Sequence, residues 1–127
     1  MTERQCRRLL REDVLPVILG NSLAAHRLAF RLSLRYGLSP ILFAPHRRAL
    51  DLLDPFGRVL PSETEDARLA CEQLCDLAER YEGVTLYLIP ATPREQTWLG
   101  AHTEALEGAF RLTDPQELSR QFSPLSR

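Results

Sequence analysis

The 127-residue sequence contains no lysine, and all 16 of its basic side chains are therefore arginine. Lysine supplies the Schiff-base amine of many enzymes and a compact charge that binds phosphate, whereas arginine stays protonated and cannot act as a base. Schiff-base chemistry, a phosphate-loop lysine and an ammonium general base are therefore excluded. Any kinase or nucleotide-ligase mechanism that needs a lysine is excluded for this chain alone.

An excess of charge of either sign is also lacking, since 16 basic and 17 acidic residues give a net charge of -1. Such a chain has no general attraction for nucleic acid or an anionic membrane, and we expect neither as a partner. The hydrophobic fraction of 44% supports a buried core. At this length we expect that core to belong to one domain.

Cysteine is scarce, and the three present show no metal-ligand or Cys-x-x-Cys spacing. This pattern indicates a reducing compartment. We interpret Cys71 and Cys75, four residues apart on a predicted helix, as small core residues rather than a redox pair. The first thirteen residues contain no apolar segment typical of a secretory signal, so we expect a cytoplasmic protein.

Residues 1–12 are predicted to form a basic leader helix, because four arginines follow the spacing of one helical side. That side is either solvated or in contact with an anion or an acidic partner. The four arginines are Arg4, Arg7, Arg8 and Arg11.

Residues 14–45 organise the rest of the chain. The apolar run 14–20 is too short to span a bilayer and is typical of a strand buried on both faces. Asn21 or Ser22 can cap the following helix, which Gly37 is expected to end. A second strand follows at 41–45, which predicts a right-handed β-α-β unit.

Strands and helices continue to alternate over residues 13–127, which predicts a single α/β domain. The expected architecture is a three-layer, Rossmann-like parallel sheet of about five strands with helices on both faces, in the order 3-2-1-4-5. Further elements are expected as a short helix at 46–54, a strand at 58–61, a helix at 63–81 capped by Ser62 or Thr64, a strand at 84–90, a helix from Thr92 to Ala109 interrupted near Gly100, a strand at 110–112 and a last helix at 114–122.

This strand order places a ligand crevice between the carboxyl ends of strands one and four. The predicted ligand-binding residues are Gly20, Asn21 and Ser22 on one side and Pro90, Ala91 and Thr92 on the other.

The crevice lacks the features of a dinucleotide site, which requires Gly-x-Gly-x-x-Gly and a carboxylate after the second strand. The equivalent segment 20–25 keeps only the first glycine, and no carboxylate follows directly at 44–48. NAD and NADP are therefore disfavoured. The helix N-terminus could still hold a carboxylate or a phosphate.

No catalytic residue and no metal site are predicted. Ser22 lies on a strand-to-helix turn but lacks the Gly-x-Ser-x-Gly flanks of a nucleophile elbow. His26, in the first long helix, His46, at the start of a short one, and His102, within a later one, are interpreted as surface or packing residues. Their spacing is not that of metal ligands.

Three segments carry a family resemblance: Leu15-Pro16-Val17-Ile18-Leu19-Gly20-Asn21-Ser22, Leu86-Tyr87-Leu88-Ile89-Pro90-Ala91-Thr92, and 102–110 followed by the Asp-Pro turn at 114–115. Residues 13–122 resemble the N-terminal, pre-ATP-grasp domain of the ATP-grasp carboxylate–amine ligases. The Asp-Lys pair often found after the family's last helix is replaced by Gln121-Phe122-Ser123-Pro124.

The resemblance implies the fold and a substrate-side contact, and it does not imply ligase activity. The family's ATP-binding lysines and metal-binding carboxylates lie in domains that follow this segment, whereas this sequence ends at Arg127. ATP and Mg²⁺ are thus implied only for those ligase domains, and no cofactor is expected in this chain.

Two functions follow as expectations. The first is a substrate-side or docking domain of an ATP-grasp-type ligase, free-standing or excised and without complete catalytic machinery, with ligase domains and a small anionic ligand as its partners. The second is a Rossmann-like nucleotide-binding module that is regulatory or linked to an oxidoreductase.

Overall fold

A five-stranded parallel sheet in the order β3-β2-β1-β4-β5 forms the centre of the computed structural model. The structure describes residues 14–54, 57–62 and 66–121, so the leader helix predicted at 1–12 lies outside the described residues. The parallel order confirms the sequence prediction. The strands are β1 (Val14–Leu19), β2 (Ile41–Ala44), β3 (Arg58–Pro61), β4 (Thr85–Pro90) and β5 (Arg111–Leu112).

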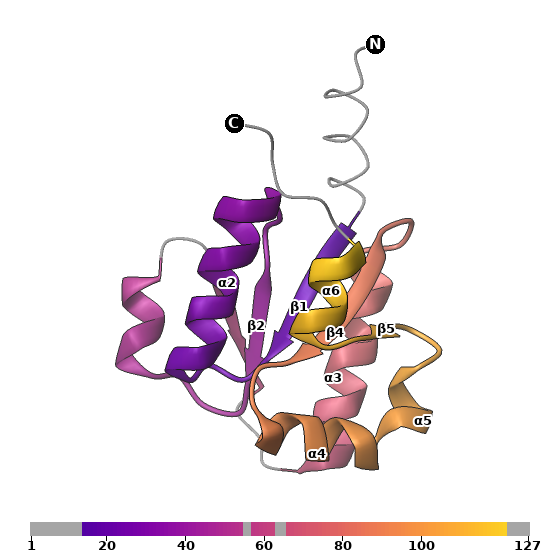
Figure 1. The fold of residues 1–127 in the computed structure, drawn as a ribbon. Helices are drawn as coiled ribbons and strands as arrows, with labels where there is room; N and C mark the ends of the chain where they lie inside the picture. Colours follow the sequence, from indigo (N-terminus) through magenta and orange to yellow (C-terminus); the bar gives the residue numbers. More distant parts are fainter. Residues whose placement is uncertain (1–13, 55–56, 63–65, 122–127) are drawn as a thin grey trace.

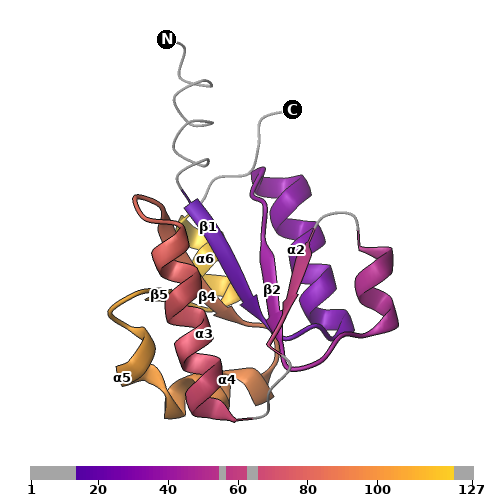
Figure 2. The same ribbon diagram turned by 180° about the vertical axis from the view of Figure 1, so that it is seen from behind.

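Helices cover both faces of the sheet and complete the expected three layers (Figures 1 and 2). On one face α2 and α6 pack over the sheet, and on the other α3, α4 and α5 do so. The helical elements are α2 (Leu23–Tyr36), the 3₁₀ helix η1 (Ala49–Leu53), α3 (Ala67–Arg80), α4 (Pro93–Ala101), α5 (Thr103–Leu106) and α6 (Pro115–Gln121).

The two central strands are buried on both faces, as their continuous apolar runs predict. Successive side chains of a strand point to opposite faces. Val17 and Leu88 accordingly pack with the α3 layer, whereas Ile18 and Ile89 pack with α2. All four are completely buried, so these strands fix the position of both helical layers.

Pro16 lies in the central strand although proline cannot donate a backbone hydrogen bond. Its partner in β4 is Tyr87, while pairing of β1 with β2 begins one residue later, between Val17 and Ile41. Every second residue of a strand directs its N–H to the same neighbouring strand, and Gly20 N–H, at the end of β1, donates to the Phe43 carbonyl of β2 (2.8 Å). Pro16 lies four residues before Gly20, so its nitrogen faces the same side, at a level where β2 has not yet begun.

Both ends of α2 match the sequence prediction. The Ser22 hydroxyl accepts a hydrogen bond from Ala25 N–H (3.4 Å), which identifies Ser22 as the N-cap. Gly37 follows the helix with φ of 69°, a left-handed conformation that glycine adopts without steric penalty.

The predicted cap of α3 is wrong. Neither Ser62 nor Thr64 caps it, since the N-cap is Asp66, whose carboxylate accepts from Arg68 N–H (2.9 Å). Several caps compete in this acidic and hydroxyl-rich stretch, and local sequence does not rank them. The helix therefore begins at Ala67, several residues later than predicted.

The predicted helices around His46 and His102 also need correction. The helix expected from His46 is a 3₁₀ helix that starts at Ala49, so His46 lies outside it. The helix expected through His102 divides there into α4 and α5, whereas Gly100 is helical and α5 ends before Ala109. The Thr103 hydroxyl donates to the Leu99 carbonyl (3.0 Å) at this joint.

Within the described ranges, no helix combines the length and the hydropathy that crossing a bilayer requires.

Candidate functional site

The structure brings the two halves of the predicted crevice to one edge of the sheet. Leu19 is in register with Pro90 at the carboxyl ends of β1 and β4. Ala91 N–H then donates to the Leu19 carbonyl (3.2 Å), which holds the segment 90–92 beside Gly20. Gly20–Ser22 and Pro90–Thr92 are therefore neighbours, and their role in binding stays a prediction.

The side chain of Glu95, which the sequence analysis did not select, lies against Gly20 at the predicted crevice. Glu95 lies in the first turn of α4, where the Thr92 hydroxyl donates a hydrogen bond to its carboxylate. The carboxylate lies so close to Gly20 that a Cβ atom there would collide with it. Gly20 also has φ of 108°, which excludes most other residues on backbone grounds. The crevice thus holds a negative charge directly against its glycine.

Asn21 directs its side chain away from the crevice. Its amide nitrogen donates to the His46 carbonyl (2.6 Å) and to Asp51 Oδ2 (3.0 Å), and only 4% of the residue is exposed. Asn21 therefore fastens the segment after β2. In this conformation it can meet a crevice ligand only through its backbone.

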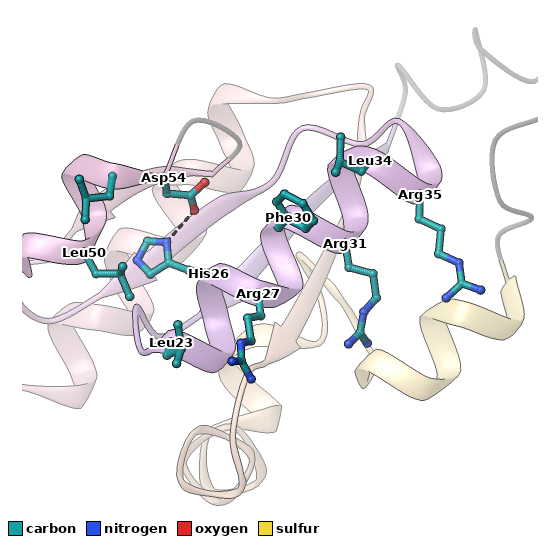
Figure 3. Close-up of a pocket in the computed structure, with 10 residues that line it drawn as sticks. Leu23, His26, Arg27, Phe30, Arg31, Leu34, Arg35, Leu50 and Asp54 are labelled. Carbon is teal, nitrogen blue, oxygen red and sulfur yellow. Dashed lines mark hydrogen bonds and ion pairs between the residues drawn. The ribbon is translucent and has the colours of Figure 1, made fainter. Parts of the chain in front are cut away.

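A buried cluster of one histidine and two aspartates lies beside Asn21. His26 Nδ1 is 2.6 Å from Asp54 Oδ2, and His26 Nε2 is 2.8 Å from Asp51 Oδ1. The three side chains are only 5–7% exposed. Figure 3 shows the His26 ring directed from α2 toward Asp54. We call His26, Asp51 and Asp54 the Asp–His–Asp cluster.

The geometry defines the contacts of the cluster. An ionised carboxylate only accepts hydrogen bonds, so a ring nitrogen of His26 that faces an ionised aspartate donates to it. Burial raises the pKa of Asp51, but hydrogen bonds from Arg48 N–H, His26 and Asn21 and the charge of His26 outweigh it. The net result is a pKa of Asp51 below its ordinary value.

The cluster is suited to holding structure rather than to catalysis. Both ring nitrogens of His26 are engaged by carboxylates, so neither can exchange a proton with a substrate while the contacts persist. Gly57 N–H also donates to Asp54 Oδ1 (3.0 Å), and a Cβ on Gly57 would come within 2.9 Å of Asp54 Oδ2. The cluster therefore fastens η1 and the chain that follows it onto α2.

A groove of about 570 Å³ runs between α2 and η1, next to the Asp–His–Asp cluster. Leucine and phenylalanine side chains make up half of its lining residues. Arg27, Arg31 and Arg35, spaced four residues apart, extend in a row from α2 on the side away from η1 (Figure 3). The remaining lining residues are Leu23, His26, Phe30, Leu34, Leu50, Leu53 and Asp54.

The thiols of α3 behave as the sequence analysis predicted. Cys71 is buried and Cys75 partly buried, and both are free. Burial raises the pKa of both thiols, with smaller contributions from Cys75 on Cys71 and from Asp76 and Glu79 on Cys75. A raised pKa lowers the thiolate fraction, so a redox role is disfavoured.

Among the residues that the structure describes, no group of histidine, cysteine, aspartate and glutamate side chains is arranged to hold a metal ion. No family model, curated protein or solved structure matches this chain.

Sequence reasoning placed His26 among packing residues and missed its two aspartate partners. The signal was the pair of acids three residues apart at Asp51 and Asp54, which places both on one side of a short helix. Nothing in the local pattern pairs that side with a histidine 25 residues earlier, because only the β-α-β crossover brings the two segments together.

Proposed function

We propose that this domain is a substrate-side or docking domain of an ATP-grasp-type ligase, free-standing or part of a longer chain. The observation that carries the proposal is the juxtaposition of Gly20–Ser22 with Pro90–Thr92 at the carboxyl ends of β1 and β4. In open α/β sheets, ligands bind at this point, where the strand order reverses.

The proposed ligand is a small molecule that carries a carboxylate or a phosphate. The N-terminus of α2 supplies backbone N–H groups and a partial positive charge, which favour an anion. Ser22 already accepts from Ala25 N–H, so the other N–H groups of the first turn are the donors in this proposal. Because there is one glycine and no lysine here, we expect weak binding.

Glu95 sets a condition on this ligand. Its carboxylate occupies the space against Gly20 and repels a second anion, although it stands at the end of a flexible side chain. The ligand therefore displaces Glu95, or presents a hydrogen-bond donor to it beside its own anionic group. A nucleotide pyrophosphate, with no donor at that point, fits this arrangement less well.

Activation by ATP is assigned to the ligase domains in this proposal. Acyl-phosphate formation requires metal ions and cationic side chains that neutralise a triphosphate. This chain offers no lysine for that purpose. The proposed contribution of the domain is to bind and orient the ligand or to dock onto the ligase domains.

The test is a nuclear magnetic resonance titration of the isotope-labelled chain with small carboxylates, inorganic phosphate, amino acids and ATP. We expect the amides of Asn21, Ser22 and Leu23 to shift first, with Thr92 following. The Glu95→Gln variant should bind simple anions more tightly because it removes the opposing charge while keeping the side-chain shape.

Arg68→Gln provides the matched control, since this exposed side chain lies on α3 and its loss should leave the titration unchanged. Shifts confined to residues outside Gly20–Ser22 and Pro90–Thr92 would move the site elsewhere. NADH and NADPH are titrated in the same way, and saturable shifts with these two ligands alone would support the nucleotide-binding module instead of the ligase domain.

A further inference from the structure

The outer side of α2 combines apolar side chains with arginine and contains no acid. Leu23 and Leu34 on this helix are each 54% exposed, and Leu53 on η1 is 76% exposed. All three line the groove between α2 and η1, and Figure 3 shows Leu23 and Leu34 on α2. Apolar side chains grouped along a groove are characteristic of an interaction surface, whereas isolated exposed ones are ordinary.

The arginines beside the groove share one side of α2 and, within the described residues, form no ion pair. Arg27, Arg31 and Arg35 are exposed along one side of α2, and the helix itself has no acidic residue. Among the described residues, no carboxylate forms an ion pair with them. Asp54, the acid that lines the groove, is engaged by His26, which also contacts Asp51.

We propose that the groove between α2 and η1, with the Arg27–Arg31–Arg35 row, is a docking surface for an acidic amphipathic helix of a partner protein. The proposal rests on the docking role proposed above and names the chemistry of the partner. Leucine-type side chains of the partner helix fill the groove, and its glutamates or aspartates face the arginine row. This is the helix-in-groove mode of recognition, with charge complementarity fixing the orientation.

Charge and shape favour this occupant over the alternatives. Two copies of this chain meeting through α2 would bring two arginine rows together without an acid between them. A flat anionic membrane would meet the arginines but leave the hollow between α2 and η1 unfilled. The 14 residues of α2 extend over about 21 Å, which matches about four turns of a partner helix.

The test measures binding of the full 127-residue chain to a designed acidic peptide by fluorescence anisotropy. The probe has about 18 residues, with leucine at i, i+3, i+4 and i+7 and glutamate at the exposed positions, a length at which a helix can form. We expect saturable binding that weakens at least tenfold in Arg27→Glu/Arg31→Glu and about fivefold in Leu34→Ser. A peptide with lysine in place of glutamate should not bind.

Arg68→Glu on α3 is the matched control, because it reverses an equally exposed charge on the other long helix and should leave binding unchanged. The proposal is overturned if peptide binding does not saturate, or if Arg68→Glu weakens peptide binding as much as the α2 variants do. It is also overturned if the chain binds anionic phosphatidylglycerol vesicles or itself instead of the peptide, and the α2 variants abolish that binding. Amide shifts at Asn21–Leu23 with small anions test the predicted crevice, whereas peptide binding tests the groove. Failure of the proposed function and failure of the docking surface can therefore be distinguished.

Discussion

The two long helices of this domain have the same length, but the side chains on their outer faces differ in charge. Both α2 and α3 contain 14 residues and pack a leucine-rich side onto the central strands. Outward, α2 presents leucine, phenylalanine and arginine with no acid, whereas α3 carries both signs of charge, including an Arg68–Glu72 ion pair (3.8 Å). The smaller groove beside α3, of about 460 Å³, is lined by charged residues of both signs. Because both helices pack onto the sheet through their inner sides, packing in the core does not account for the different composition of their outer sides.

The largest difference between the two helices is expected at His26, the buried polar side chain of α2. His26→Ala should lower the free energy of unfolding by about 4 kcal/mol, because it leaves two buried carboxylates without the ring that contacts both of them. Chemical denaturation measures this loss. Glu72→Ala on the exposed side of α3 should change stability by less than about 0.5 kcal/mol. A loss below about 1 kcal/mol in His26→Ala would show that the cluster does not hold η1 on α2.

The inner faces should respond alike. Leu32→Ala on α2 and Leu74→Ala on α3 each remove a side chain that is at most 2% exposed. Each should lower the free energy of unfolding by about 3 kcal/mol through lost burial and the cavity left behind. Denaturant titration of both variants measures the two values side by side. Unequal losses, with one variant near wild type, would contradict the equivalence of the two helical layers.

A smaller effect is the pH dependence of stability that arises from Asp51, the η1 carboxylate in contact with His26 of α2. The pKa of Asp51 is lowered in the folded protein, so its ionised form stabilises the fold above the unfolded pKa of about 3.9. That contribution is lost as the pH falls through the lower, folded pKa, because the unfolded chain binds the proton more readily. We expect stability to decline below about pH 4 and the decline to be shallower in Asp51→Asn. Asp76→Asn on α3 is the control, and an unchanged slope in Asp51→Asn would contradict the assignment.

The smallest effect on stability concerns the outer faces. Leu34→Ser on α2 and Leu69→Ser on α3 alter side chains that are 54% and 47% exposed, so each should change stability by less than about 0.5 kcal/mol. The two should differ in binding of a hydrophobic dye, since Leu34 is grouped with other apolar side chains along the groove between α2 and η1. Dye fluorescence should fall in Leu34→Ser and remain near wild type in Leu69→Ser. Equal responses would mean that the groove is no more apolar than the rest of the surface.

Much of the fold was predictable because it depends on patterns that are local. The continuous apolar runs at β1 and β4 predict strands covered on both sides, and Ser22 and Gly37 mark the ends of α2 by their backbone preferences. The alternation of strands with helices then leads to the observed strand order. The first residue of a helix was less predictable where several residues can serve as its N-cap, as Ser62, Thr64 and Asp66 can before α3.

The candidate site was predictable only in outline. Its place at the ends of β1 and β4 follows from the strand order. The position of Glu95 against Gly20 depends on how the first turn of α4 is oriented, which the sequence pattern does not predict. His26 and its aspartates meet across the β-α-β crossover, so their pairing depends on tertiary packing. Likewise, Asn21 could have faced a ligand, but its amide is committed to His46 and Asp51.

The central place of β1 has a consequence for how the chain folds during synthesis. One side of β1 pairs with β2, which follows after a single helix, but its other side pairs from Val14 to Leu19 with β4, beginning at Thr85. Until Thr85–Pro90 has left the ribosome, β1 is an apolar edge strand with open backbone donors and acceptors. Such an edge is prone to pair with other chains. The β1–β4 contact thus also ends the interval in which the nascent chain is most exposed to aggregation.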